Sequence, residues 1–272
     1  DAFAFSLDYW GTGSAATGDY SPIGGSSVQP FADGSAGSGA AFRSLYNGNI
    51  ASMGVSLTKP SDPLYHAENF DPLLYLYRYD QLNRIVAMNT RKGLVANSWM
   101  NAAAIADYNE AVTYDPNGNI LTYNRNGTTN AYGVPASRTH NLQMDRLTYK
   151  YPQDATGGHF TSNKLRYVHD QTAETEYDED IDNQTSLSLA AVQSQQLDSQ
   201  PGDNYQYDEI GNLVKDVKEG ITSNEWTVYG KLKKVTKADN STIEYSYGPD
   251  GNRISKKVTP AAGTGETVTT SY

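Results

Sequence analysis

A short unit built around Tyr, Asp and Gly recurs along this chain, and it constrains the fold more than any other feature. Clear copies occupy residues 77–86, 114–121, 205–214 and 245–254, and shorter relatives occupy residues 45–50 and 147–151. Each clear copy places turn-forming residues between an aromatic residue and an aliphatic one. Repetition of one small unit predicts an architecture assembled from similar pieces that stabilise one another.

The centre of the unit has the composition of a three-residue hairpin loop. An Asp at the first turn position accepts hydrogen bonds from the backbone amides that follow, and Pro suits the second position. Pro116 and Pro249 occupy that second position. Three residues after the turn begins, Gly or Asn supplies the left-handed conformation that closes such a loop, and Asn83 fills this place in the first copy. The residues with a predicted structural role are Tyr79, Asp80, Tyr114, Asp115, Gly118, Tyr207, Asp208, Gly211, Tyr247 and Gly251.

A three-residue loop also fixes the pairing across each hairpin. It predicts that Tyr207 faces Leu213, and in the same way it pairs Tyr114 with Ile120 and Tyr79 with Ile85. The next residue in each copy is also aliphatic and points to the opposite face. A lone hairpin with apolar side chains on both faces is unstable in water. The sequence therefore predicts an all-β fold, a curved sheet of successive antiparallel β-hairpins.

Composition agrees with this fold class and excludes several kinds of partner. Tyr (21) outnumbers Phe (6) and Trp (3) together, and Gly (24) and Pro (11) supply chain reversals. The formal net charge of −10 disfavours nucleic acid and anionic lipid. The chain has no Cys, so disulfides, zinc ribbons and thiol nucleophiles are excluded, and no apolar run approaches the length of a membrane span.

Two domains are predicted, with a boundary at residue 44. Residues 1–44 comprise a strand with alternating Phe3, Phe5 and Leu7, followed by a linker rich in Gly, Ser and Ala over residues 11–42. Residues 45–272 carry the hairpins. Residues 94–108 suit one short helix or a pair of strands, and residues 187–197 suit a loop or a frayed helical turn. The chain begins at Asp1 and ends within a strand-like pattern, so we expect a fragment of a longer protein.

The Tyr-Asp-x-x-Gly-Asn-aliphatic signature resembles the RHS or YD-repeat family over roughly residues 45–272. The likeness is densest at residues 145–151 and 204–257, and residues 45–50 and 79–84 resemble versions from Bacteroidetes-type members. The resemblance implies a hairpin sheet that wraps a hollow shell, in a bacterial protein that is secreted or exposed on the cell surface. The self-cleaving core segment of that family is not found, so the resemblance places this chain upstream of the core and carries over no catalytic residue.

No constellation of residues predicts catalysis or a bound cofactor. His66, His140, His159 and His169 are scattered, and we expect them in loops, solvated or hydrogen-bonded. The turn aspartates are explained by their hairpins. The acidic run at residues 174–183 is the best candidate for a metal site, with Ca²⁺ held by Asp178, Asp180 and Asp182. A solvated charged loop is the simpler interpretation of that run.

The leading hypothesis is therefore structural and not enzymatic. It makes the chain a segment of a β-shell that encloses or presents a C-terminal toxin or effector. Its partners would be the rest of its own longer chain, including the cargo domain, and possible further partners are secretion machinery or surface glycans. The alternative hypothesis is a cell-surface adhesion or carbohydrate-binding module, in which exposed Tyr and Trp rings stack on sugars. A glycoside hydrolase would need two carboxylates across a cleft, and the sequence offers no such pair.

Overall fold

The computed structural model describes residues 3–10, 34, 42–57, 71–128, 142–173, 177, 180–185 and 202–272. The predicted linker at residues 11–42 lies outside this part, apart from Gly34 and Phe42. Residues 187–197 lie outside it as well.

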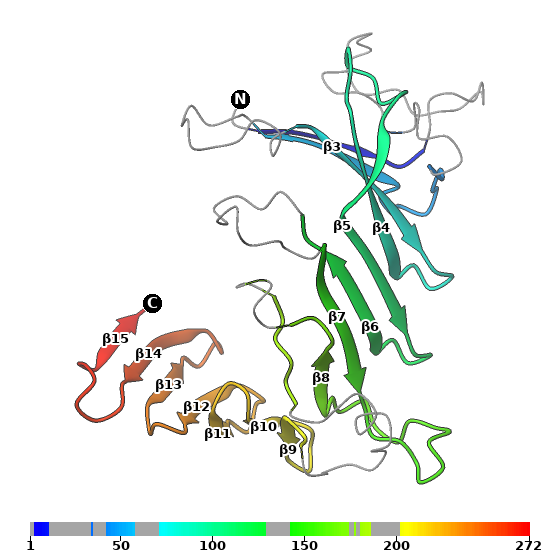
Figure 1. The fold of residues 1–272 in the computed structure, drawn as a ribbon. Helices are drawn as coiled ribbons and strands as arrows, with labels where there is room; N and C mark the ends of the chain where they lie inside the picture. The colour runs from blue at the N-terminus through cyan, green and yellow to red at the C-terminus, as the bar shows by residue number, and fades with distance from the viewer. Residues whose placement is uncertain are drawn as a thin grey trace. The chain divides into compact units, whose positions relative to one another are not determined.

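The described part of the chain contains fifteen β-strands and no helix, so the predicted all-β class is confirmed (Figure 1). The strands of the first sheet are β1 (Phe3–Asp8), β2 (Ser52–Leu57), β3 (Leu73–Tyr79), β4 (Ile85–Lys92), β5 (Ala103–Tyr114), β6 (Ile120–Asn126), β7 (Gln143–Lys150) and β8 (Tyr167–Asp170). Those of the second are β9 (Tyr205–Tyr207), β10 (Leu213–Asp216), β11 (Ile221–Trp226), β12 (Leu232–Lys237), β13 (Thr242–Tyr247), β14 (Arg253–Thr259) and β15 (Val268–Ser271).

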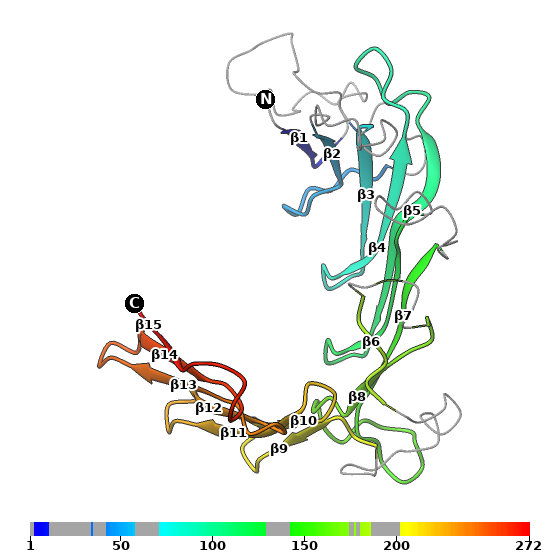
Figure 2. The same ribbon diagram turned by 60° about the vertical axis from the view of Figure 1, so that its left-hand side comes forward.

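Both sheets follow one simple rule: each strand pairs with the next strand in the sequence. The first sheet runs β1 to β8 in order, and the second runs β9 to β15 in order (Figure 2). Each sheet ends in two different edge strands and is open. The predicted arrangement of successive antiparallel hairpins is thus confirmed, and β5 shows that residues 94–108 contribute to a strand.

The chain divides into two compact units. One contains residues 1–114, 122–146 and 172–180, and the other contains residues 115–121, 147–171 and 181–272. This division does not test the predicted boundary at residue 44. The strand predicted at the start of the chain is present as β1, which pairs with β2 from Phe3↔Leu57 to Asp8↔Ser52.

The first unit has a small apolar core beside β3. Leu74 and Leu76 alternate along that strand and bury their side chains against Trp99 and Ala102. Partly buried Phe42 and Leu94 complete the cluster. Most other strand residues are only half-buried, which fits a sheet whose stability depends on its neighbours along the chain as much as on a core.

In the second unit, Arg166 links the strands on either side of it. Its backbone N–H donates to the carbonyl of Lys150 (2.8 Å), and its carbonyl accepts from the N–H groups of Asn204 (2.8 Å) and Tyr205 (3.0 Å). The Arg166 side chain is 1% exposed and donates from Nη2 to Oδ1 of Asp203 at 2.5 Å. Asn204 in turn donates from Nδ2 to Asp216 at 2.9 Å. A buried polar network therefore connects β7 with β9.

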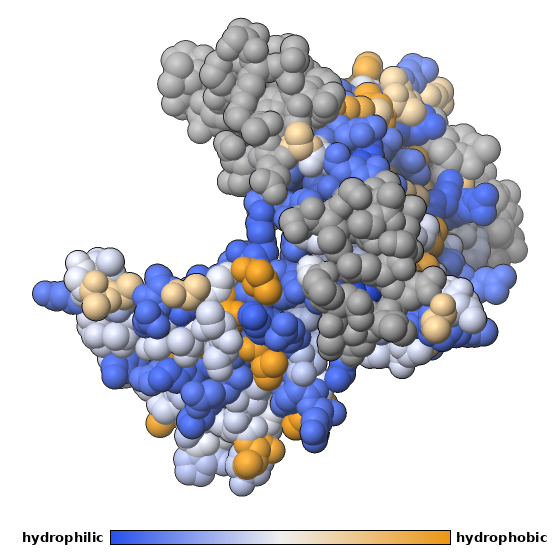
Figure 3. Space-filling model, turned by 60° about the horizontal axis from the view of Figure 1, so that its bottom comes forward, coloured by the Kyte–Doolittle hydropathy of each residue, from blue (hydrophilic) through white to orange (hydrophobic). Residues whose placement is uncertain are grey.

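On the face of the molecule seen in Figure 3, hydrophobic residues appear in small separate groups among hydrophilic ones. No described segment forms a helix with the length and apolar character needed to cross a lipid bilayer.

Candidate functional site

The hairpin loop at Asp208 shows the geometry of the repeat. The N–H of Asp208 donates to the carbonyl of Asn212 (2.9 Å), and the N–H of Gly211 donates back to the carbonyl of Asp208 (3.1 Å). Gly211 has a φ of 95°, the left-handed conformation that the sequence predicts for it. Tyr207 faces Leu213, as predicted. The three-residue loop is therefore confirmed here.

The Asp208 carboxylate clamps its own loop. Oδ1 accepts from the backbone N–H groups of Ile210 (3.1 Å) and Asn212 (2.8 Å), and Oδ2 accepts from the Asn212 side chain (2.9 Å). Burial raises the pKa of this carboxyl, but the hydrogen bonds from Asn212, Ile210 and Gly211 outweigh it, so the pKa lies below its ordinary value of 3.8. The charged form of Asp208 is the one that holds the loop.

The same clamp recurs at Asp80 and Asp115. Asp80 accepts from the backbone N–H groups of Leu82 (2.9 Å) and Arg84 (3.0 Å) and from the Arg84 guanidinium (2.7 Å). Asp115 accepts from the backbone (2.8 Å) and side chain (2.7 Å) of Asn119. The predicted pairing of Tyr79 with Ile85 is present. The backbone hydrogen bond from Arg84 is the main reason that the pKa of Asp80 is lowered.

The fourth copy reaches the same loop by a different route. Gly248 occupies the first turn position, and Asp250 two residues later accepts from the backbone (3.1 Å) and the side chain (2.6 Å) of Asn252. These bonds lower the pKa of Asp250. Tyr247 faces Arg253 across the hairpin. The loop geometry therefore tolerates a change in which residue supplies the carboxylate.

Two further loops of this kind escaped the sequence analysis. They begin at Thr227 and Lys237, and their left-handed residues are Gly230 (φ 71°) and Asn240 (φ 66°). In the described part of the chain, six loops share both backbone hydrogen bonds, those that begin at Asp80, Asp115, Asp208, Thr227, Lys237 and Gly248. The signal that could have found the two missed loops is a Gly or Asn three residues after the first residue of the loop, at the end of a short strand.

A tyrosine ties each copy of the repeat to a segment earlier in the chain. In all four clear copies the Tyr hydroxyl donates to the backbone carbonyl of an aliphatic residue; we call this contact the tyrosine–carbonyl bond. The pairs are Tyr79 with Ile50 (2.9 Å), Tyr114 with Ile85 (2.8 Å), Tyr207 with Leu165 (2.9 Å) and Tyr247 with Leu232 (2.8 Å).

In three of these four contacts a cation covers the tyrosine ring. The cation is the residue immediately before the aliphatic one: Arg84 lies 4.6 Å from the centroid of the Tyr114 ring, Lys164 lies 5.8 Å from Tyr207, and Lys231 lies 5.6 Å from Tyr247. A cation in this position is attracted to the negative face of the ring. In these three contacts a basic residue and the aliphatic residue after it act together: the aliphatic residue supplies the acceptor carbonyl, and the basic residue covers the ring. The sequence alone did not reveal this pattern.

Asparagine side chains add a second link between loops that lie far apart in the sequence. Asn47 and Asn49 both donate to Oδ1 of Asn83, at 2.6 and 3.1 Å. In the second unit, Asn119 donates to Oδ1 of Asn163 at 2.8 Å. Together the clamps, the tyrosine–carbonyl bonds and the asparagine links hold loop residues in place. What this arrangement supplies is mechanical cohesion between hairpins.

Only some of the candidate calcium ligands and histidines lie among the residues that the structure describes. Asp178 lies outside the described residues, and Asp182 forms an ion pair with Lys218 (3.4 Å), so the calcium site stays a prediction. His66 and His140 also lie outside the described residues.

Of the two described histidines, one is not in a loop. His159 lies 3.0 Å from Asp154 at an exposed position, in agreement with the expectation. His169 lies within β8, where it pairs with Thr148 and is buried. The expectation of a loop position was wrong for His169, because β8 adds to β7.

Comparison with known proteins gives likenesses to solved structures only. No family model matches this chain, and no curated protein matches it. The crystal structure of TcdB2-TccC3-Cdc42 is similar with a TM-score of 0.31 and 16% identity, and that of TcdB2-TccC3 with 0.29 and 16%. The crystal structure of TcdB2-TccC3-TEV is similar with 0.28 and 15%. Each match covers 83% of this chain and 13% of the other, so the chain spans a small part of their length.

Proposed function

We propose that this chain is a wall segment of an RHS or YD-repeat protein, whose hairpin sheet encloses or presents a C-terminal toxin or effector. The observation that carries the proposal is the tyrosine–carbonyl bond, which recurs with nearly constant length at Tyr79, Tyr114, Tyr207 and Tyr247. A contact repeated from hairpin to hairpin makes a sheet that extends by addition of like units.

The function of such a wall is steric. Sequential pairing leaves each sheet with backbone edges only at its two end strands. An inner strand pairs on both sides, so a protease cannot draw it out without breaking both rows of backbone hydrogen bonds. A polypeptide behind a wall of this kind is kept from solvent and proteases until the wall opens.

The proposal assigns no catalytic activity and no cofactor to this segment. The carboxylates of Asp80, Asp115 and Asp208 accept hydrogen bonds from their own loops, and these bonds account for their positions. The partners proposed are the rest of a longer chain with its cargo domain, and the location proposed is the bacterial surface or the exterior of the cell.

Limited proteolysis of the intact protein that carries this segment tests the proposal. A double variant with Tyr207→Phe and Tyr247→Phe removes two hydroxyl donors and keeps both rings. We expect sequence on the C-terminal side of the wall to resist protease in the wild type and to be cut sooner in the variant. Equal rates of cleavage, mapped by mass spectrometry, would show that the segment does not shield a cargo.

One observation favours the second candidate, a carbohydrate-binding adhesion module. The rings of Trp10 and Tyr46 stack with their centroids 6.1 Å apart and an interplanar angle of 9°, and Tyr46 is 75% exposed. An exposed aromatic plane suits the apolar side of a sugar ring. A glycan array distinguishes this candidate: binding that disappears with Tyr46→Ala would support it, and no binding would count against it.

A further inference from the structure

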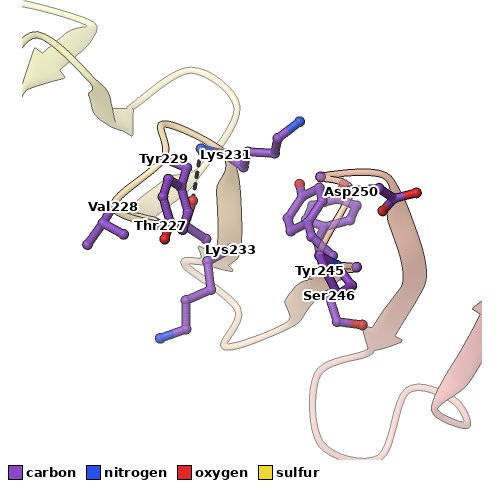
Figure 4. Close-up of a pocket in the computed structure, with 12 residues that line it drawn as sticks. Thr227, Val228, Tyr229, Lys231, Lys233, Tyr245, Ser246 and Asp250 are labelled. Carbon is purple, nitrogen blue, oxygen red and sulfur yellow. Dashed lines mark hydrogen bonds between the residues drawn. The ribbon is translucent and has the colours of Figure 1, made fainter.

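A groove of about 700 Å³ opens between two loops of the second sheet (Figure 4). One wall comes from the loop that begins at Thr227, and the other comes from the loop that begins at Gly248. We call this space the basic groove and define it by Val228, Tyr229, Lys231, Lys233, Tyr245 and Tyr247.

The floor of the basic groove follows from the pairing of β12 with β13. The register Lys234↔Glu244 places Lys233 beside Tyr245. Side chains alternate along a strand, so Lys231 and Tyr247 lie on the same face as this pair. The floor is therefore a row of two lysines next to two tyrosines.

The wall at the loop that begins at Thr227 is apolar and open to solvent. Val228 is 92% exposed and Tyr229 is 88% exposed, and both line the groove. These two adjacent side chains offer a ligand in the groove an apolar surface to pack on.

The charge of this region is opposite to that of the chain. Residues 226–259 contain seven Lys and Arg and three Asp and Glu, a formal net charge of +4, whereas the whole chain carries −10. Lys231 forms no ion pair with any residue that the structure describes, but after the hydrogen bonds from Asn252 its charge also helps to lower the pKa of Asp250. Lys233 forms an exposed ion pair with Glu225 (3.3 Å). The Asp250 carboxylate, also in the lining, accepts hydrogen bonds from Asn252. The lining of the groove therefore carries two Lys against one Asp, a net positive charge.

The tyrosine rings limit the kinds of ligand that fit. Lys231 covers the Tyr247 ring, and Arg253 lies 5.4 Å from the centroid of the Tyr245 ring. Cations over both rings compete with a sugar for stacking. A ligand that meets ammonium groups on the floor and apolar groups on the wall needs carboxylates alternating with apolar side chains.

We propose that the basic groove binds a short acidic segment of extended polypeptide. One carboxylate of the ligand meets Lys231, and a neighbouring apolar side chain packs on Val228 and Tyr229. Extended chain places alternate side chains on opposite sides, which matches a basic floor beside an apolar rim. The inference rests on the proposed function, since a wall that encloses a polypeptide needs places to hold it.

Fluorescence anisotropy of the intact protein with a labelled hexapeptide of alternating Glu and Leu tests the inference. We expect Lys231→Gln to weaken binding about tenfold, the size of effect that loss of one close charge pair produces. Tyr229→Ser should also weaken binding, and its exposed position leaves folding intact. Lys257→Gln, on β14 within the same basic region but on the opposite face of the sheet, is the matched control and should bind within about twofold of wild type.

Several outcomes would overturn the inference. These are equal binding by all variants, equal binding of a peptide of alternating Lys and Leu, and preferential binding of polygalacturonate that is lost with Tyr229→Ser. The last result would make the groove a site for acidic glycans. Protease protection of the cargo is a separate readout that Tyr229→Ser leaves unchanged, so failure of the groove and failure of the wall are distinguishable.

Discussion

The hydroxyl of Tyr207 donates to the carbonyl oxygen of Leu165 at 2.9 Å, across 42 positions of sequence. Tyr207 ends β9, and Leu165 lies just before Arg166, so this bond joins the last strands of the first sheet to the start of the second within one compact unit. Lys164 adds a cation over the same ring. The same contact recurs in the other three clear copies, so a variant at Tyr207 measures what the tyrosine–carbonyl bond contributes to stability.

Replacing Tyr207 with Phe should destabilise the protein by about 1 kcal/mol, because the Leu165 carbonyl loses its donor while the ring stays in place. Urea denaturation measures the change as a lower midpoint with an unchanged slope. Tyr229→Phe is the matched control, since that hydroxyl is exposed on a loop and its loss should leave the midpoint unchanged. Equal midpoints for the two variants would show that the Tyr207 hydroxyl does not stabilise the fold.

Gly211→Ala should cost roughly 1 kcal/mol or more, because φ is 95° at this position and a Cβ strains that conformation. No atom lies within 4 Å of the position a Cβ would take, so the cost comes from the backbone alone. Gly265→Ala is the control, since a Cβ there makes ordinary contact with Pro260. Thermal unfolding of the two variants compares them, and a stable Gly211→Ala protein would contradict the loop geometry.

These hairpins also show what the sequence can and cannot reveal. The Asp and Gly positions act through their own neighbours, so the loops and the pairs Tyr79–Ile85 and Tyr207–Leu213 were predictable. The acceptor of each Tyr hydroxyl was not, because it depends on which strands become neighbours.

Other features were hidden from sequence for similar reasons. The buried Arg166–Asp203 pair joins residues 37 positions apart, and nothing local marks either one. The basic groove forms only when two loops come side by side, so its lining is scattered in the sequence.

Loss of Asp203 should be severe. Asp203→Ala leaves the buried Arg166 guanidinium without its carboxylate, and removal of one partner of a buried pair costs about 3–5 kcal/mol. The double variant with Arg166→Met and Asp203→Leu should recover part of that loss, because neither charge of this pair is then left buried without the other. Glu225→Gln, in the exposed pair with Lys233, is the control and should change stability by less than about 1 kcal/mol. Urea denaturation of all three variants provides the comparison, and a mild effect of Asp203→Ala alone would contradict this account.

Acid should loosen the hairpin loops in a defined range. The pKa values of Asp80, Asp208 and Asp250 are lowered in the folded state, so these carboxylates stabilise it above pH 3.8 and lose that contribution as the pH falls through their folded values. As the pH falls, carboxyl-carbon NMR titration should show these three carboxylates protonating below the ordinary value of 3.8. Asp208→Asn should reduce the dependence of stability on pH below the ordinary carboxyl value of 3.8, and an unchanged dependence would contradict the clamp.

Alkali should act through the tyrosines. Burial raises the pKa of Tyr123, Tyr151 and Tyr167 to about 12, so the neutral ring stabilises the folded state fully below the ordinary value of 10.0. This contribution is lost as the pH rises through about 12. Absorbance at the tyrosinate band, followed together with circular dichroism, should show part of the tyrosines ionising only as the sheet unfolds. Complete ionisation of the tyrosines near pH 10 with the sheet intact would contradict the raised pKa values.

The order of strands in each sheet has a consequence for how the chain is made. Because β1 to β8 and β9 to β15 each follow the sequence, a strand finds its neighbour in the next strand to be synthesised. Folding can then keep pace with translation, and a newly finished edge waits only for the segment that emerges next.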